Sequence, residues 1–358
     1  MNKRRISSFT ALLKTGEAFL LNNYSHLFYL TGYEGDAGFG IALDDKLTLF
    51  VDFRFVEQAK DETKCQVIDY KNQILTSVTK FLHQKKVSKL FFDVSMVSYG
   101  SYLEWQKYLA SSNIEFLPGE DGILQLRAVK DSEELVNIER AAIIADKGYF
   151  YLKSIIKAGI TEKELARRLD GFMLEQGAEK LAFPTILAFG GHGALPHAVP
   201  SGRVLKENEF IIADFGCQVQ GYCSDMTRTL YLGEADIEAK YYYDTVMEAQ
   251  QAALAIIKAG AICKDVDNAS RSVIAKQGLA EFFGHGLGHG VGVEVHEEPK
   301  LNSTSDTVLM EQMVVTVEPG IYLPEKFGIR IEDLVVVTKQ GYRSLSEAPK
   351  DEWEIKVV

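Results

Sequence analysis

Histidine and glycine are concentrated in one short segment of the chain, HGLGHGVGVEVHEEP at residues 285–299. His285, His289 and His296, three of the chain's 7 histidines, lie in it. Imidazole binds metals and carries protons near neutral pH, so this concentration indicates a functional site. The i, i+4 spacing of the first two histidines is that of the HExxH zinc helix, but Gly286 replaces the glutamate and the glycines disfavour a helix.

The glycines of this segment also differ in spacing from the GxGxxG phosphate loop. Residues 290–296 instead alternate between apolar and polar side chains, which predicts a strand with Glu294 and His296 on one face. Glycine allows a backbone or an imidazole to approach another group closely. The segment is therefore predicted to line a site.

Acidic residues in an apolar hairpin provide a second set of candidates. The sequence EFIIADFGCQVQGYCSDMTRTLYL (209–232) predicts two strands joined by a short turn. If the turn is centred on residues 219–220, Asp214 lies directly opposite Asp225. Like charges placed in this way are destabilising, so a cation is expected between them, and Arg228 is the alternative source of positive charge.

The segment MVVTVEPGIYLPEKFGIRIEDLVVV (313–337) repeats this arrangement. Glu318 ends one apolar run and Glu332 interrupts the next. Four carboxylates with one imidazole suit manganese, iron, cobalt or zinc better than calcium.

An internal duplication is predicted to place these two hairpins. IIKAG occurs at 155–159 and at 256–260, and each copy is followed by a QG that would end a helix, at Gly177 and Gly278. LKENEFIIADFG, from Leu205, also aligns without a gap with LMEQMVVTVEPG. Two helices followed by a hairpin are therefore predicted to occur twice, with chance similarity of these short segments as the alternative.

The overall composition is that of an ordinary globular protein. The chain has 358 residues with 46% hydrophobic and 25% charged residues, which predicts two or three domains. Lys and Arg total 39 against 50 for Asp and Glu, a balance that disfavours general nucleic-acid binding. The 4 cysteines lack CxxC spacing, and neither a signal peptide nor a membrane span is indicated, so we expect a cytoplasmic protein.

Several motifs, in order along the chain, resemble those of the pita-bread metallopeptidases, in particular the Xaa-Pro branch that contains prolidase and aminopeptidase P. The motifs are IIADFG (211–216), YCSDMTRT (222–229), HGLGHGVGVEVHEEP (285–299), TVEPGIY (316–322) and GIRIED (328–333). The segments HLFYLTGY and FVDFRFVEQA are similar to the creatinase-like domain that precedes the catalytic domain in this branch. Methionine aminopeptidases lack that domain, and creatinases lack the full ligand set.

The resemblance implies an α+β fold with two domains. Residues 1–125 would form a smaller α/β creatinase-like domain, and residues 126–358 a pita-bread catalytic domain with duplicated helix-helix-hairpin halves. The resemblance also implies that five side chains bind two divalent metal ions: Asp214, Asp225, His289, Glu318 and Glu332. Manganese is the expected ion, with cobalt, zinc and iron as alternatives.

The resemblance assigns roles to the remaining candidates. Glu318 would also serve as general base, and His197 and His296 would stabilise the oxyanion. Arg330 and Tyr322 would orient the ligands, and His285 would line the pocket. Lys300 stands where we expect arginine in related proteins, and a lysine lacks the bidentate fork that would hold a substrate carboxylate.

The implied activity is hydrolysis of the bond before proline in di- or oligopeptides. An Xaa-Pro dipeptidase is favoured, with an aminopeptidase P that acts on longer peptides as the alternative. A family member that kept the fold as a non-catalytic binding module is a third reading, which the complete ligand set disfavours. The resemblance also implies a homodimer, and no membrane or nucleic-acid partner is expected.

Overall fold

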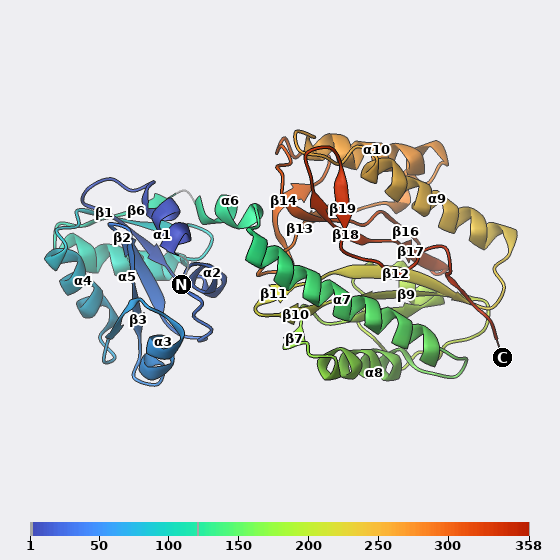
Figure 1. The fold of residues 1–358 in the computed structure, drawn as a ribbon, viewed down its shortest axis with the longest axis horizontal. Helices are drawn as coiled ribbons and strands as arrows, with labels where there is room; N and C mark the ends of the chain where they lie inside the picture. The colour runs from blue at the N-terminus through green and yellow to red at the C-terminus, as the bar shows by residue number, and fades with distance from the viewer. Residues whose placement is uncertain (1–2, 120–121, 358) are drawn as a thin grey trace. The chain divides into compact units, whose positions relative to one another are not determined.

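The computed structural model describes residues 3–119 and 122–357. The chain forms two compact units that divide after Leu126 (Figure 1). Pro118 and Gly119 belong to the last strand of the first unit. Within the described ranges, no helix is long and apolar enough to cross a membrane.

The first unit is an α/β domain built on a mixed sheet. Its strands are β1 (Glu17–Leu21), β2 (Phe39–Leu43), β3 (Lys46–Val51), β4 (Gln66–Asp69), β5 (Lys89–Asp93) and β6 (Glu115–Gly119). The sheet order is β4-β3-β2-β1-β5-β6, in which β2 runs antiparallel to both of its neighbours and the outer pairs are parallel. The helices are α1 (Lys3–Thr10), α2 (Tyr24–Thr31), α3 (Val56–Glu62), α4 (Ile74–Gln84), α5 (Tyr99–Ala110) and α6 (Gly122–Ala128), the last of which spans the division.

The core of this unit lies between the sheet and its helices. Ile41, Phe50 and Leu90 of the strands are fully buried and cluster with Val78 and Leu82 of α4. Burial of apolar side chains of this size supplies the main stabilisation of such a layer.

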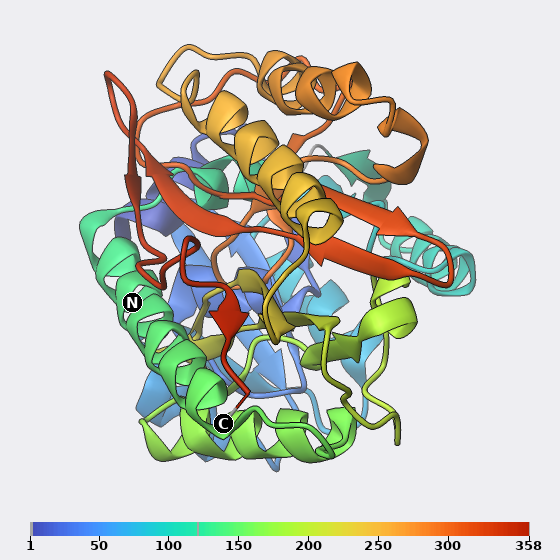
Figure 2. The same cartoon turned by 90° about the vertical axis from the view of Figure 1, so that its right-hand side faces the viewer.

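The second unit places its strands between two pairs of helices (Figures 1 and 2). The helices are α7 (Ser132–Ile155), α8 (Glu162–Glu175), α9 (Ile237–Leu254) and α10 (Cys263–Lys276), with short 3₁₀ turns η1 (Gly190–Ala194) and η2 (Ala280–Phe282). The strands that carry the candidate site are β8 (Ile186–Phe189), β9 (Glu209–Phe215), β12 (Met226–Leu232), β13 (Gly288–Gly290), β14 (Glu297–Leu301), β15 (Val314–Val317), β16 (Gly320–Leu323), β17 (Phe327–Arg330) and β18 (Asp333–Val337).

Shorter strands complete the sheets of this unit. They are β7 (Lys180–Leu181), β10 (Cys217–Val219), β11 (Tyr222–Cys223), β19 (Tyr342–Ser344) and β20 (Glu354–Ile355). The sheet orders are β11-β10-β7, β20-β12-β9-β8, β14-β13-β15-β18-β19 and β16-β17.

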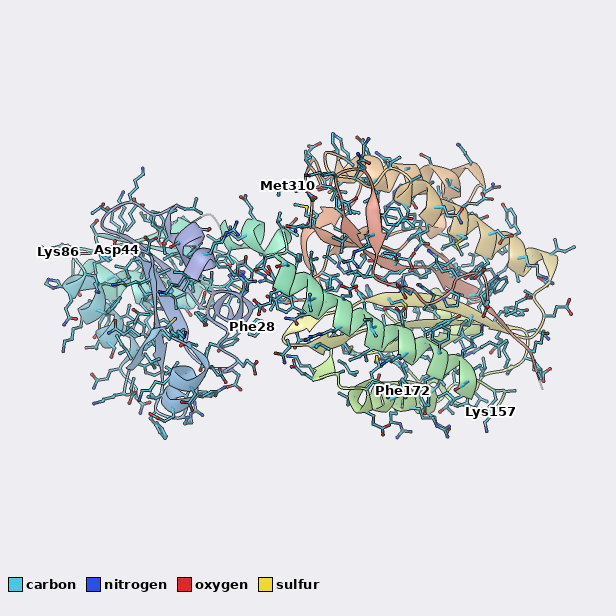
Figure 3. All side chains as sticks on the ribbon, viewed as in Figure 1. Phe28, Asp44, Lys86, Lys157, Phe172 and Met310 are labelled. Atoms are coloured by element: carbon cyan, nitrogen blue, oxygen red, sulfur yellow. The ribbon has the colours of Figure 1, made fainter. Side chains whose placement is uncertain are left out.

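Helices α7 and α8 both begin at a capping residue. Asp131 and Glu134 form a complete capping box at the start of α7, and Thr161 accepts a hydrogen bond from the Glu164 amide at the start of α8. Helices α7 and α8 pack against each other, and Tyr151 of α7 stacks on Phe172 of α8 with ring centroids 4.3 Å apart (Phe172 is labelled in Figure 3).

The two halves of the second unit repeat the same backbone pattern. Helices α8 and α10 have equal length, and their first residues are numbers 162 and 263. Just before each helix lies an equivalent isolated β-bridge, Thr161 to Val204 in the first half and Ile262 to Val308 in the second. The predicted duplication is therefore present in the fold.

Candidate metal centre and active site

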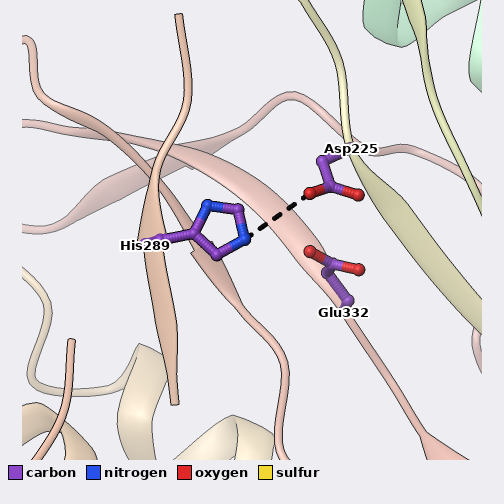
Figure 4. Close-up of side chains that lie close together, drawn as sticks. All are labelled: Asp225, His289 and Glu332. Atoms are coloured by element: carbon purple, nitrogen blue, oxygen red, sulfur yellow. Dashed lines mark ion pairs between the residues drawn. The ribbon is translucent and has the colours of Figure 1, made fainter. Parts of the chain in front are cut away.

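Three of the predicted metal ligands form a compact group of donor atoms. One side-chain atom from each of Asp225, His289 and Glu332 lies within 4.8 Å of the other two (Figure 4). His289 Nε2 lies 3.6 Å from Asp225 Oδ2 and 3.2 Å from Glu318 Oε1. Carboxylates with one imidazole are a donor set suited to divalent transition metals.

Two buried carboxylate oxygens of this centre are left without a hydrogen bond. Arg330 Nη2 donates to Asp214 Oδ2 at 2.7 Å, and Thr227 Oγ1 donates to Glu332 Oε2 at 2.6 Å. The other oxygens, Asp214 Oδ1 and Glu332 Oε1, have no partner in the described part of the chain. Buried polar atoms are nearly always paired, so two unpaired oxygens in one acidic cluster fit a divalent cation.

The first hairpin has a different register from the one expected. Asp214 is paired with Thr227, and Asp225 lies just before β12 instead of directly opposite Asp214. The turn is centred on Gln220 and Gly221, whose φ angles are 49° and 75°, so both adopt the left-handed conformation of a two-residue hairpin turn. The expected direct opposition of Asp214 and Asp225 was wrong, because the turn lies one residue further along the chain than predicted and Asp214 therefore faces Thr227.

The second hairpin lies beside the first at the centre. Glu318 follows β15 directly, and Glu332, with Ile331, separates β17 from β18. The Glu332 amide donates to the Thr227 carbonyl at 3.1 Å, which ties this strand break to β12. The acidic residues of the two halves therefore meet at strand ends.

The glycines next to His289 are explained by close backbone approach. A Cβ atom on Gly288 would lie 2.2 Å from the Thr316 carbonyl oxygen, and one on Gly290 would lie 2.1 Å from the Glu298 carbonyl oxygen. Any side chain at these positions would push β13 away from its neighbours. The glycines therefore let β13 carry His289 between two strands.

Burial and mutual repulsion disfavour negative charge on several of these carboxylates. Burial raises the pKa of Asp225 well above its usual range, and the charge of Glu332 adds to this effect. Burial also raises the pKa of Glu332 well above its usual range, with Glu318 as the next cause. Burial opposes charge on His289 and Glu318 too and is the largest single cause for each, but their mutual hydrogen bond and opposite charges, with smaller contributions from neighbouring groups, together outweigh it. The pKa of His289 is therefore raised and that of Glu318 is lowered. A cation would offset this repulsion.

Arg330 connects the centre to two other predicted residues. Its guanidinium donates to Asp214 and, through Nη1, to the Tyr322 hydroxyl at 2.7 Å and the Pro196 carbonyl at 3.2 Å. The Tyr322 hydroxyl also lies 2.9 Å from His285 Nε2. Burial raises the pKa of Tyr322 to about 12, so its hydroxyl stays protonated. These contacts hold Arg330 and Tyr322 beside the acidic cluster.

The remaining histidines lie on loops. The predicted strand at 290–296 was wrong, because β13 ends at Gly290 and the chain resumes pairing only at Glu297. The loop places His296 next to His289, with ring centroids 4.3 Å apart. His197 follows η1, is exposed, and acts electrostatically on His296.

A buried ion cluster that the sequence did not reveal holds the His296 loop. Arg127 Nη2 pairs with Glu294 at 2.7 Å and also with Glu297, and Lys130 Nζ lies 3.4 Å from Glu297. The Glu297 carboxylate also accepts a hydrogen bond from the Glu294 amide at 3.0 Å. The acidic pair of HEEP was visible in the sequence, but its basic partners lie about 170 residues earlier.

Two threonines were also missed as parts of the centre. Thr227 donates to Glu332 and accepts from Arg330 Nε at 3.0 Å. Thr316 accepts from the His289 amide at 3.0 Å and donates to Glu318 at 3.1 Å. Both lie within the quoted motifs, two residues from a predicted ligand, since Thr227 follows Asp225 and Thr316 precedes Glu318. In an extended chain that spacing places two side chains on the same face, which was the available signal.

Comparison with known protein families agrees with the motifs. Residues 136–339 match metallopeptidase family M24, and residues 5–129 match the creatinase/prolidase N-terminal domain. A protein named Xaa-Pro dipeptidase from Pyrococcus horikoshii is 36% identical over 94% of this chain and 94% of its own length.

Solved structures with the same fold include relatives with different names. An Xaa-Pro dipeptidase from Bacillus anthracis superposes with a TM-score of 0.92 at 36% identity, covering 98% of both chains. An X-Pro aminopeptidase from Thermotoga maritima has a TM-score of 0.88 at 36% identity, covering 98% of this chain and 100% of the other. The resemblance inferred from the motifs and the predicted fold class are confirmed. The chain belongs to metallopeptidase family M24, with a creatinase/prolidase N-terminal domain before the catalytic unit.

Proposed function

We propose that this protein hydrolyses Xaa-Pro peptide bonds with two divalent metal ions, most readily manganese, and that it prefers dipeptides. The single observation that supports a metal centre best is a pair of buried oxygens in one acidic cluster, Asp214 Oδ1 and Glu332 Oε1, which have no hydrogen-bond partner among the described residues. The proposed ligands are Asp214, Asp225, His289, Glu318 and Glu332. Such ions, when bound, polarise the scissile carbonyl and lower the pKa of a water molecule.

Glu318 is the proposed general base. Its side chain is partly exposed, unlike the buried Asp225 and Glu332. It could therefore contact a water molecule while it binds a metal ion. The low pKa of Glu318 keeps the carboxylate ready to accept a proton, and Thr316 holds one of its oxygens.

His197 and His296 are proposed to stabilise the oxyanion that forms at the scissile carbonyl. Burial lowers the pKa of His296, and the nearby charges of His289 and His197 act in the same direction. A neutral imidazole with one N–H is a suitable hydrogen-bond donor to a developing negative charge. The contacts among Arg330, Tyr322 and His285 would keep the opposite wall of the pocket in place.

Lys300 is the proposed partner of the substrate carboxylate. It lies opposite His289 in the β13–β14 pair, and opposed residues in an antiparallel pair project to the same face. Lys300 is exposed, so its ammonium group is available to a ligand. A free carboxylate one residue beyond the scissile bond exists only in a dipeptide, which favours dipeptidase activity.

Aminopeptidase activity on longer peptides is the alternative. A lysine attracts a carboxylate as a point charge without the bidentate geometry of arginine, so the selection against longer peptides is weaker. The comparison with both a dipeptidase and an aminopeptidase at 36% identity supports either specificity.

The test is hydrolysis of a matched peptide pair, Leu-Pro and Leu-Pro-Gly, by protein that is first stripped with EDTA and then loaded with manganese, cobalt, zinc or iron. Cleavage of Leu-Pro alone supports the dipeptidase, and preferred cleavage of Leu-Pro-Gly supports the aminopeptidase. Metal analysis and size-exclusion chromatography check the proposed two ions and homodimer. We also propose that the protein is located in the cytoplasm. No hydrolysis of either peptide with any metal, together with no bound metal, would refute the proposal in favour of a binding module.

A further inference from the structure

A fully buried carboxylate lies at the start of α8, outside the metal centre. Glu162 has no exposed surface, although glutamate is almost never fully buried without partners. It follows the N-cap Thr161, so its charge lies at the positive end of the helix. The helix N-terminus explains why a carboxylate can be buried at position 162, but it does not explain the role of that carboxylate.

The Glu162 carboxylate accepts hydrogen bonds from both ends of one loop. The Phe189 amide, where β8 ends, lies 2.9 Å from Oε1. The Ser201 amide and hydroxyl lie 2.8 Å and 2.6 Å from Oε2. His192 Nδ1, in η1, lies 2.9 Å from both oxygens. One side chain therefore closes the loop between residues 189 and 201.

That loop carries His197 and reaches the acidic centre. Its Pro196 carbonyl accepts from Arg330, which also holds Asp214. A Cβ on Gly191 would lie 2.6 Å from the Glu325 carbonyl oxygen, so the loop also packs closely against the β16–β17 turn. The loop is thus held at its base by Glu162 and near its tip by Arg330.

We propose that Glu162 is a positioning residue that acts through His197. By holding both ends of the loop, its carboxylate places the His197 imidazole where the oxyanion forms. This inference rests on the proposed function, in which His197 stabilises that oxyanion. Since the interaction would exist mainly in the transition state, loss of either residue should lower kcat with little change in KM.

Glu162→Gln tests the proposal with little change in side-chain size. The new amide group would turn a donor toward the N–H of Phe189 or of Ser201, so one end of the loop would lose its partner. We expect kcat for the better of Leu-Pro and Leu-Pro-Gly to fall by roughly 10- to 100-fold, as for small displacements of catalytic groups. The matched control is Glu164→Gln in the same helix turn, where Glu164 pairs with Arg168 at the surface and kcat should not change.

A double-mutant cycle with His197→Ala separates positioning from a general loss of folded protein. If Glu162 acts through His197, the double variant should be no slower than His197→Ala alone. If Glu162 only stabilises the fold, the two losses should multiply, and the bound metal per chain should fall as well. Multiplicative losses, or a kcat for Glu162→Gln within twofold of wild type, would overturn the proposal.

A different set of results would overturn the proposed function. Wild-type protein that hydrolyses neither peptide, or a fully active His197→Ala variant, would overturn the assigned role of His197 and this inference with it. A slow His197→Ala variant with multiplicative losses would overturn this inference alone. If Glu162→Gln does not fold, Ser201→Ala removes one of the hydrogen bonds to Glu162, together with the acceptor of the Arg203 amide, and the same cycle decides the outcome.

Discussion

Replacement of Asp225 by asparagine should make the metal-free catalytic unit more stable while it abolishes hydrolysis. Asp225 is only 5% exposed, and its ligand atom lies within 4.8 Å of one from Glu332. Two unit negative charges at that separation repel each other by roughly 3 kcal/mol at an effective dielectric constant of about 20. Asparagine keeps the size of the side chain and removes its charge.

The expected gain at neutral pH is about 1–3 kcal/mol in the free energy of unfolding, because protonation of one carboxyl already relieves part of the repulsion. The pH dependence has a definite sign. Burial, then the charges of Glu332 and Asp214, raise the folded-state pKa of Asp225. The folded state then binds more protons, so the wild type loses stability as pH rises from about 4, the unfolded pKa, through the folded pKa. The advantage of the variant should therefore grow over the same interval.

Tryptophan fluorescence can follow the catalytic unit alone. The chain has 2 tryptophans, Trp105 in α5 of the first unit and Trp353 in the second, where it stacks on Tyr243 with centroids 4.2 Å apart. In a Trp105→Phe background, urea and thermal unfolding with EDTA report on the second unit. A gain of 1 kcal/mol should raise its Tm by about 2–4 °C.

The stability of the wild type and of Asp225→Asn with and without manganese provides the matched comparison. Manganese should stabilise the wild type and have much less effect on the variant, because a ligand has been lost. The reasoning is refuted if the metal-free variant is less stable than the wild type at neutral pH, or if manganese stabilises both proteins equally. Hydrolysis near the wild-type rate would refute the assignment of Asp225 as a ligand.

Three other substitutions test separate parts of the site. Glu318→Gln should lower kcat by about 10²–10⁴-fold with the first unit still folded, and a rate near wild type would exclude Glu318 as the base. Lys300→Ala should raise KM for Leu-Pro by roughly fivefold, the value of an exposed ion pair, while KM for Leu-Pro-Gly stays constant; equal effects on both would argue against carboxylate binding. Glu297→Gln should cost the second unit about 3–5 kcal/mol, because the buried Lys130 loses its counterion and the buried Arg127 keeps only the more exposed Glu294. Burial opposes the charge of Glu297, but Lys130 and Arg127 outweigh it and lower its pKa. The wild type should therefore lose this stability as pH falls through the acid range, as seen by Trp353 fluorescence, and the variant should not.

Local signals predicted the helices and the strand ends well. The glycines of the two QG pairs, Gly177 and Gly278, lie just after α8 and α10 with φ of 102° and 74°, so they mark helix ends through backbone angles that are set within a few residues. Such signals depend on neighbours in sequence, so they can be read without the fold. The strand predicted at 290–296 failed because a distant ion cluster with Arg127 holds that loop.

The strand register of the first hairpin could not be predicted from such local signals. The hairpin turn lies at Gln220 and Gly221, one residue from the predicted centre, and that shift replaced Asp225 by Thr227 as the partner of Asp214. Either register keeps apolar residues along both strands, so the pattern alone does not choose between them.

The sequence by itself determined the family, the two-part organisation and the residue types of a metal centre, since these are carried by short motifs in order along the chain. Only the tertiary structure decided which of those atoms meet and what holds them. Glu162 closes the His197 loop, Glu297 holds the His296 loop, and two carboxylate oxygens of the acidic cluster have no partner within residues 3–119 and 122–357. These contacts join residues far apart in sequence, and their hydrogen bonds depend on three-dimensional packing that no local spacing specifies.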